Sequence, residues 1–436
     1  MAIELMGNQE EEAPLVVADA SESETPKNPT RDVHILSCSF LLVFLAYGAA
    51  QNLETTVNAR GNLGTVTLGI LYVSFAVFSL FASLVVRVMG SKNALVLGTT
   101  GYWLFIAANL KPTWYTMIPV SLFLGFAASI IWVGEGTYLT SLARNHASDS
   151  NLHEGTVIGN FNGEFWAMFA LHQFVGNLIT LAVLESGADG STSNKTFLFI
   201  VFLCSMTLGT ILMCFLHKID DKEEKVSDDS SVSFFSAVIS RLKITASFCM
   251  TYVCNFRAEY TKDVVNPTLG EAGVGGAMAV YGAFDAICSL VAGRLTSGLR
   301  SITIIVCVGA FFQAVIFIWL SLKYSATGGV LGIVYPLLMA ALLGIGDGVL
   351  NTQLSALLAL LFKHDMEGAF SQLKVWQSSA ISAVFFLNPS VTLRTMAMFM
   401  LAAIFVSLAP FMYLILKVEK AFSKPNTEDP RRYIHL

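Results

Sequence analysis

Long apolar runs, separated by short polar breaks, occupy most of the sequence. A helix that crosses a bilayer needs about 20 apolar residues, and most of the runs approach that length. There are twelve of them, at 33–51, 65–86, 94–110, 115–138, 156–184, 196–216, 242–256, 272–293, 302–322, 330–354, 370–387 and 395–416. The pattern predicts an all-helical protein with twelve membrane spans. The seventh run is the weakest, because it is short and polar residues interrupt it.

One three-residue motif occurs late in the fourth run and again late in the tenth. It reads Gly-Glu-Gly at 134–136 and Gly-Asp-Gly at 346–348, a separation of 212 residues, and a Glu-Gly pair follows each copy, at 154–155 and 367–368. Parallel repeats of this kind build many transporter folds. We therefore expect two six-helix bundles, at 33–216 and 242–416, joined by a linker at 217–241. Tails at 1–32 and 417–436 flank them, and the first is acidic and predicted to be disordered.

Composition supports the membrane assignment, and the basic residues predict its orientation. Hydrophobic residues make up 54% of the chain and charged residues 13%, against about 25% charged in soluble proteins. With both termini cytoplasmic, 19 of the 26 Lys and Arg residues fall on the inside, as the positive-inside rule expects. The sequon at Asn194 then lies outside, where it can be glycosylated. The host membrane is expected to be the plasma membrane or an endomembrane such as the vacuole.

Four acidic residues lie inside predicted spans, and they are the candidates for a proton or cation site. A charge at the centre of a membrane helix costs about 2.5–3.5 kcal/mol, so such residues mark functional positions. One interpretation is a pathway for protons or cations. The other is a set of ion pairs at the cytoplasmic rim, with Arg87, Arg144, Arg294 or Lys374 as partners. The four acids are Glu135, Glu164, Asp285 and Asp347.

Polar side chains in the fifth and tenth spans predict the lining of a cavity between the bundles. Polar groups in a span face the bundle interior or water, although hydrogen bonding between helices alone also explains them. His172 is more typical of a packed, hydrogen-bonded residue than of a ligand. The candidates are Asn162, His172, Gln173, Asn177, Asn351 and Gln353.

Two short basic loops follow the second and eighth spans. The first contains Arg87, Gly90 and Lys92, and the second contains Gly293 and Arg294. Glycine permits a tight turn, and arginine can bond the last carbonyls of a helix. Both loops resemble the gating loops of the major facilitator superfamily but lack the usual aspartate. Plain positive-inside anchoring explains them equally well.

Other classes of function receive no support from the sequence. No nucleophile stands beside a base at a motif spacing, and there is no phosphate-binding loop or basic patch for nucleic acid. The seven cysteines fall in apolar runs without metal-ligand spacing. We therefore expect neither an enzyme nor a catalytic residue, a metal or a cofactor, and the expected surroundings are the lipid bilayer.

The chain resembles the Unc-ninety-three-like family, a divergent branch of the major facilitator superfamily, and is most similar to its plant members. The matching words include W-V-G-E-G-T-Y-L-T at 132–140, Y-G-A-F-D-A-I-C-S-L at 281–290 and G-I-G-D-G-V-L-N-T-Q at 344–353. Two departures stand out. Relatives more often have Gln at the position of Glu135, and the stretch at 234–259 does not match their seventh-span word.

The resemblance implies the twelve-helix major facilitator fold and a regulatory role. It suggests a membrane protein that controls potassium homeostasis by associating with an ion channel or another membrane protein. Two alternatives remain open. One is a secondary transporter of a small solute or cation, coupled to protons through Glu135, Glu164 and Asp347. The other is a trafficking chaperone for membrane proteins.

Overall fold

The computed structural model describes residues 29–57, 63–185, 192–219, 260–323, 330–363, 365–387 and 391–422. The predicted span at 242–256 and both predicted tails lie wholly or largely outside these residues. The described elements are α1 (Pro29–Val57), α2 (Leu63–Met89), α3 (Ser91–Ala108), α4 (Trp114–Asp149), α5 (Glu154–Glu185), α6 (Thr192–Cys214), the π-helix η3 (Thr261–Val265), α9 (Asn266–Leu295), α10 (Leu299–Lys323), α11 (Val330–Leu361), α12 (Met366–Leu387) and α13 (Leu393–Phe422).

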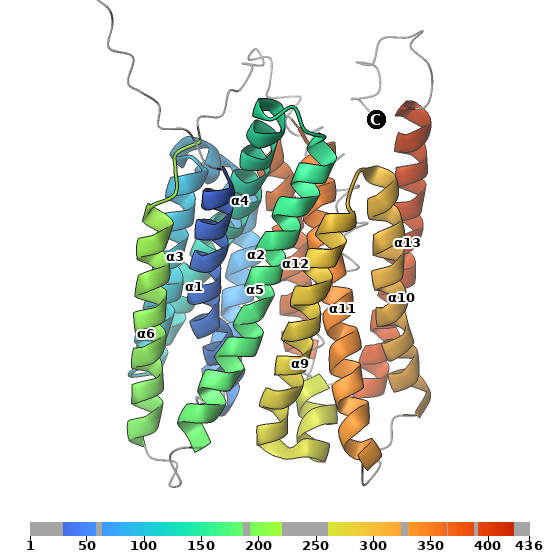
Figure 1. Cartoon of the computed structure of the whole chain (residues 1–436). Helices are drawn as coiled ribbons and strands as arrows, with labels where there is room; N and C mark the ends of the chain where they lie inside the picture. Colours follow the sequence, from blue (N-terminus) through green and yellow to red (C-terminus); the bar gives the residue numbers. More distant parts are fainter. Residues whose placement is uncertain are drawn as a thin grey trace, which may run out of the picture.

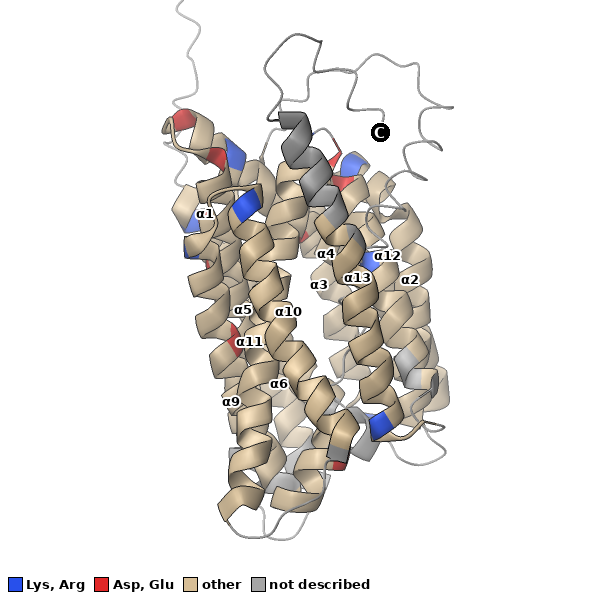
Figure 2. Cartoon of the chain, turned by 90° about the vertical axis from the view of Figure 1, so that its right-hand side faces the viewer, with Lys and Arg blue, Asp and Glu red and all other residues tan. Residues whose placement is uncertain are grey.

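The long helices stand side by side, and α1 begins on the face where α13 ends (Figure 1). We call this the terminal face and the other the opposite face. The charged residues, coloured blue and red, lie mainly toward the terminal face, and few lie in the middle of the bundle (Figure 2). Seven of the described helices are long and apolar enough to cross a membrane. The protein is therefore an integral, multi-pass membrane protein.

Glycine and threonine determine where several helices turn. Gly90 adopts φ +79° between α2 and α3, a left-handed conformation that glycine reaches without strain, as the basic-loop pattern predicts. Gly270 adopts φ +71° and breaks α9 near its start, so the chain reverses at the opposite face before the long part of α9 begins. Thr113 starts α4 with a reciprocal capping box to Thr116.

The described apolar residues form two cores. Aromatic rings dominate the first, where Phe40 packs edge-on against Trp132 and Phe165 at centroid distances of 5.4 and 5.1 Å. Such aromatic pairs contribute about 0.5–1.5 kcal/mol beyond the area they bury. This core lies mainly in the first half and extends into the second through residues of α10, α11 and α12. The second core lies within the second half and surrounds Tyr281 and Phe317.

The two halves touch most closely where α5 meets α9. A Cβ atom added at Gly163 would lie 2.8 Å from the Cα of Gly293, and one added at Gly159 would lie 2.5 Å from the Cβ of Thr296. The backbones therefore approach without intervening side chains, as small residues permit in membrane helices. On the other side of the molecule Ser371 of α12 donates to the Ser79 carbonyl of α2. These two contacts join the bundles.

Gly293→Leu tests the closeness of this contact. A leucine there cannot fit against Gly163, so α5 and α9 must separate, and overpacking of this kind costs about 1–3 kcal/mol. We expect a lower thermal unfolding midpoint for the purified protein in detergent. The matched control is Gly275→Leu on the same helix, where an added Cβ would meet nothing within 4 Å. An equal loss of stability in both variants would contradict the proposed contact.

Candidate functional site

A central cavity of about 170 Å³ lies between the two halves. Helices from both bundles line it, with α1, α2, α3, α4 and α5 on one side and α9, α10, α11, α12 and α13 on the other. This volume is below the roughly 300–1,000 Å³ of pockets for drug-sized ligands. The polar or charged residues of the described lining, tyrosines and tryptophans aside, are Gln51, His172, Gln173, Asp285, Gln313, Asp347, Asn351, Lys374 and Gln377.

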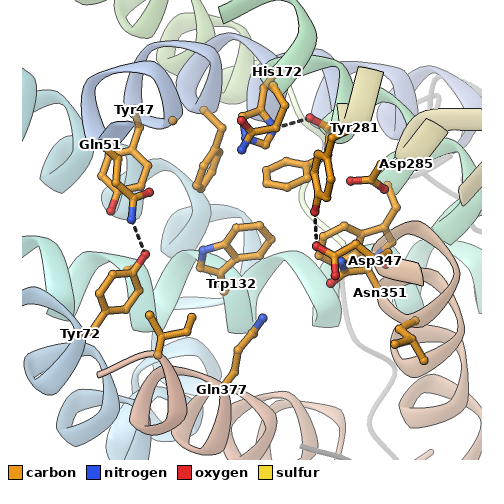
Figure 3. A pocket seen from close by; sticks show the side chains of 18 of the residues that line it. Tyr47, Gln51, Tyr72, Trp132, His172, Tyr281, Asp285, Asp347, Asn351 and Gln377 are labelled. Carbon is orange, nitrogen blue, oxygen red and sulfur yellow. Dashed lines mark hydrogen bonds between the residues drawn. The ribbon is translucent and has the colours of Figure 1, made fainter. Parts of the chain in front are cut away.

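Asp347 of α11 lies in the cavity wall of the second half (Figure 3). The Tyr281 hydroxyl donates to one carboxylate oxygen, and Nε2 of Gln313 lies 3.4 Å from the other. Asn351 donates to the backbone carbonyl of Asp347 at 3.0 Å, one helical turn further on. Asp285 of α9 lines the same wall. The structure thus brings together Asp285, Asp347 and Asn351 from the sequence-predicted set.

Lys374 reaches across from α12 to the aromatic wall of the first half. Its Nζ lies 4.4 Å from the ring centroid of Trp132 and donates to Gln377 Oε1 at 3.0 Å. An ammonium within about 6 Å of a ring centroid is held by the ring quadrupole. The charge of Lys374 also attracts Glu135 of α4, which is buried and has one oxygen without a hydrogen-bond partner. The sequence did not indicate the contact with Trp132.

The first half supplies a wall of aromatic rings. Trp132 and Trp166 stack with centroids 5.9 Å apart and planes 11° from parallel. Tyr47 and Tyr102 pack edge-on at 4.9 Å, and Tyr72 accepts a hydrogen bond from Gln51 at 2.7 Å (Figure 3). These rings pack against one another and line the side of the cavity that the first half forms.

Only some of the remaining predicted polar residues reach the cavity. His172 and Gln173 line the cavity, but Asn162 and Asn177 donate to carbonyls one turn back in α5 and do not appear in the lining. Gln353 bonds to Thr296 of α9 and belongs to the contact between helices. Glu135 and Glu164 also lie outside the lining, and Glu164 has one buried oxygen without a hydrogen-bond partner. The predicted glycosylation site Asn194 falls in the first turn of α6, and its side chain is outside the part of the chain that the structure describes.

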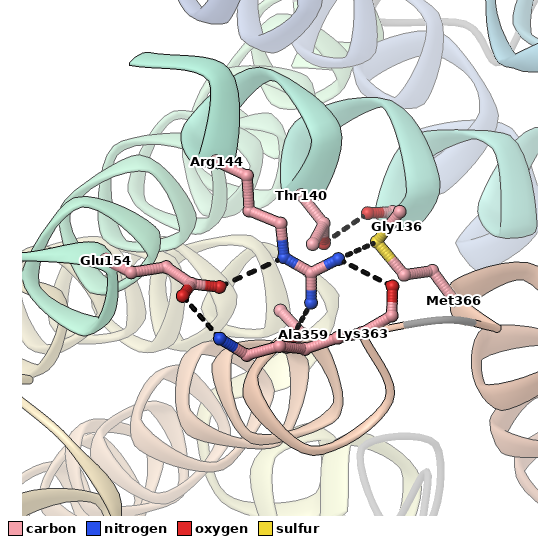
Figure 4. A network of polar contacts seen from close by, with 7 residues as sticks. All are labelled: Gly136, Thr140, Arg144, Glu154, Ala359, Lys363 and Met366. Carbon is pink, nitrogen blue, oxygen red and sulfur yellow. Dashed lines mark hydrogen bonds and ion pairs between the residues drawn. The ribbon is translucent and has the colours of Figure 1, made fainter. Parts of the chain in front are cut away.

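A cluster of ion pairs closes the terminal face, and we call it the latch (Figure 4). Arg144 of α4 contacts Glu154 at 3.1 Å and donates to the carbonyls of Ala359 and Lys363, at 2.5 and 3.0 Å. Lys363 itself pairs with Glu154 at 2.5 Å. Arg144 and Glu154 belong to the first half and the others to the second. The latch therefore ties the two bundles together beyond the cavity.

A second pair joins the halves nearby. Arg87, predicted to act in a gating loop, contacts Asp365 at 2.6 Å and Glu367 at 3.8 Å. Its side chain is 42% exposed, against 19% for Arg144. Exposed pairs contribute about 0–1 kcal/mol, whereas hydrogen bonds to charged groups contribute about 1.5–3 kcal/mol. The contacts of Arg144 therefore contribute more than those of Arg87 to holding the two halves together. Arg294, the other predicted gating arginine, is exposed at the end of α9.

Glu154 stands at the terminal-face end of α5, ahead of the apolar stretch. Its partial burial raises the pKa of the carboxyl, but the hydrogen bonds and charges of Lys363 and Arg144 outweigh burial and hold the pKa below its ordinary value. A depressed pKa stabilises the paired state above the ordinary pKa and loses that effect only as the pH falls through the lowered value. The latch therefore keeps its charges across the physiological range.

The sequence comparisons decide the family. A family model described as "Ion channel regulatory protein UNC-93" matches residues 56–258 and 247–413. The chain belongs to the UNC-93 family. It is 63% identical to UNC93-like protein 3 of Arabidopsis thaliana over 409 residues, which cover 90% of this chain and 88% of that protein. It is 28% identical to human protein unc-93 homolog A, covering 80% of this chain and 85% of that protein.

The predicted major facilitator fold of this UNC-93 family protein is confirmed by solved structures. The Escherichia coli fucose:proton symporter matches with a TM-score of 0.62 at 12% identity, covering 89% of this chain and 99% of that chain. The xylose:proton symporter matches at 0.65 and 12%, covering 90% and 95%. At such low identity the likeness concerns the fold alone.

Arg144→Gln tests the latch. It removes the charge that bonds Glu154 and two carbonyls, so the terminal face should open more often and expose the buried Thr140 one turn below. In a Thr140→Cys background we expect maleimide to label residue 140 at least about tenfold faster, which corresponds to 1.4 kcal/mol. Mass spectrometry of the labelled peptide separates this cysteine from the native ones. Arg294→Gln is the matched control and should leave the rate unchanged, and equal rates in all three proteins would refute the latch.

Proposed function

We propose that this UNC-93 family protein regulates potassium homeostasis by associating with an ion channel or transporter in the same membrane. Family membership along nearly the whole chain carries the proposal. One relative, a protein of Caenorhabditis elegans, is provisionally named a potassium channel regulatory protein. It is 29% identical over 83% of this chain, which spans 57% of that longer protein. The rest of that longer protein lies outside the matched region.

The latch suggests how such a regulator would act. A regulator needs two conformations that a partner can distinguish. Arg144 and Lys363 hold one of them by contacts between the halves, and their release would let the halves rotate. A partner that binds one arrangement better shifts the population toward it, and the latch sets the size of the shift.

Secondary transport is a second candidate, supported by the central cavity. A cavity between two bundles that are closed together at one face is the arrangement that alternating access requires. Transport would need the latch to open as the opposite face closes. The two candidates differ in one respect, because a transporter moves its solute without any partner.

Flux through the purified protein separates these candidates. In proteoliposomes that contain this protein alone, we expect no saturable uptake of radioactive rubidium, which stands in for potassium. In cells, removal of the protein should change the whole-cell potassium current, and restoring the wild type or Arg294→Gln should recover it. Arg144→Gln should recover it only in part. Saturable rubidium flux through the isolated protein would contradict regulation and favour transport.

The terminal face is proposed to be cytoplasmic, on the charge bias of the sequence. Tyr115 and Asn151 are exposed near the two ends of α4 and report opposite faces. In intact cells, with native cysteines replaced, a membrane-impermeant maleimide should label Tyr115→Cys at the plasma membrane but Asn151→Cys only after permeabilisation. For a protein held in an endomembrane, sealed vesicles replace intact cells. Labelling of both sites without permeabilisation would overturn the proposed topology.

A further inference from the structure

The central cavity has two chemically different walls. Tyr47, Tyr72 and Trp132 of the first half lie across from Asp285 and Asp347 of the second (Figure 3). Aromatic faces attract positive charge through their quadrupole, and carboxylates attract it directly. The same kind of ligand suits both walls. Neither the family description nor the names of the relatives assigns a ligand to this cavity.

An ammonium already occupies part of the aromatic wall. Nζ of Lys374 lies 4.4 Å from the centroid of Trp132, and the residue is only 5% exposed. Gln377 accepts from the same nitrogen. The lysine is therefore a tethered example of the group that this wall can hold. A free ligand with a cationic nitrogen would find the same ring chemistry on Tyr47 and Tyr72.

The charge of the lining favours a further cation. Among the described lining residues, Asp285 and Asp347 contribute two negative charges and Lys374 contributes one positive charge. Charges interact strongly in a cavity walled by apolar helices, because the effective dielectric is low. Tyr281 and Gln313 donate to Asp347 as neutral groups, so they orient its carboxylate without supplying a charge. A monovalent cation would bring the formal charge of this lining to zero.

We propose that the central cavity binds a small organic ammonium ion, with its cationic nitrogen toward Asp285 and Asp347 and its carbon groups against Tyr47 and Tyr72. The volume of about 170 Å³ limits the ligand to a few carbon atoms. A bare potassium ion suits the site less well, because potassium selects rings of oxygen ligands in place of its water shell. A neutral sugar carries no charge for the two carboxylates to attract. Binding requires neither turnover nor a protein partner.

Choline and its neutral carbon isostere, dimethylbutanol, have nearly the same shape and differ in charge. Titration calorimetry on the full-length protein in nanodiscs should give choline an affinity at least about tenfold higher than the isostere, or 1.4 kcal/mol. Asp347→Asn should remove this preference. Asp149→Asn, an exposed aspartate at the terminal-face end of α4, is the matched control and should retain it. The double variant Glu135→Gln/Lys374→Gln removes the tethered ammonium together with its counter-charge, and should bind choline more tightly than the wild type.

Several outcomes would overturn the proposal. These are equal affinity for choline and its isostere, no binding of either, or tighter binding of xylose or potassium chloride than of choline. The wild-type comparison stands even where Asp347→Asn fails to fold, because the two probes share one protein. The assay measures binding without flux or current, so its failure would leave channel regulation intact. A loss of regulation in cells would likewise leave the choline result unaffected.

Discussion

The contact between α5 and α9 determines the shape of the whole molecule. Gly159 and Gly163 are four residues apart and so lie on one face of α5, where Gly293 lets the backbones meet. The close approach continues at the level of the cavity, where a Cβ added at Gly282 of α9 would lie 3.1 Å from the backbone nitrogen of Phe174 in α5. Trp166 of α5 and Tyr281 of α9 line the cavity beside this contact. The small residues thus hold the two halves together along one edge of the cavity.

The charged side chains have different kinds of partner at the partly exposed terminal face and in the buried interior. At the terminal face Arg144, Glu154 and Lys363 form direct pairs that are partly exposed. Deeper in the bundle a direct ion pair would demand far more desolvation. There Lys374 lies on the face of Trp132 and bonds to an amide, with Glu135 as a counter-charge. Ion pairs therefore join the halves at the terminal face, and an aromatic ring and an amide help to hold charge inside the protein.

The fold was predictable from the sequence, whereas the site was predictable only in part. Apolar runs of span length and one repeated motif sufficed for the helical fold, because hydropathy is a local property. The acids were visible because a carboxylate in an apolar run is unusual, and Asp285 and Asp347 do meet in one wall. The donors to Asp347, which are Tyr281 and Gln313, lie on two other helices and look like ordinary span residues. The latch partners of Arg144 in the second half, Ala359 and Lys363, stand more than 200 residues away, and no local pattern encodes that pairing.

The repeated motif shows how two equal halves acquire unequal chemistry. Its first glycine packs the same way in both copies, since Gly134 faces α3 and Gly346 faces Gln313 of α10, the third helix of each half. The second glycine differs, because Gly136 meets Phe370 across the interface whereas Gly348 meets Asp285 within its own half. The carboxylates between the glycines differ in the same way. Glu135 is attracted by Lys374 of the other bundle, whereas Asp347 accepts a hydrogen bond from Tyr281 of its own bundle. The two carboxylates occupy corresponding places in the repeated motif, and the interface between the halves gives them different partners.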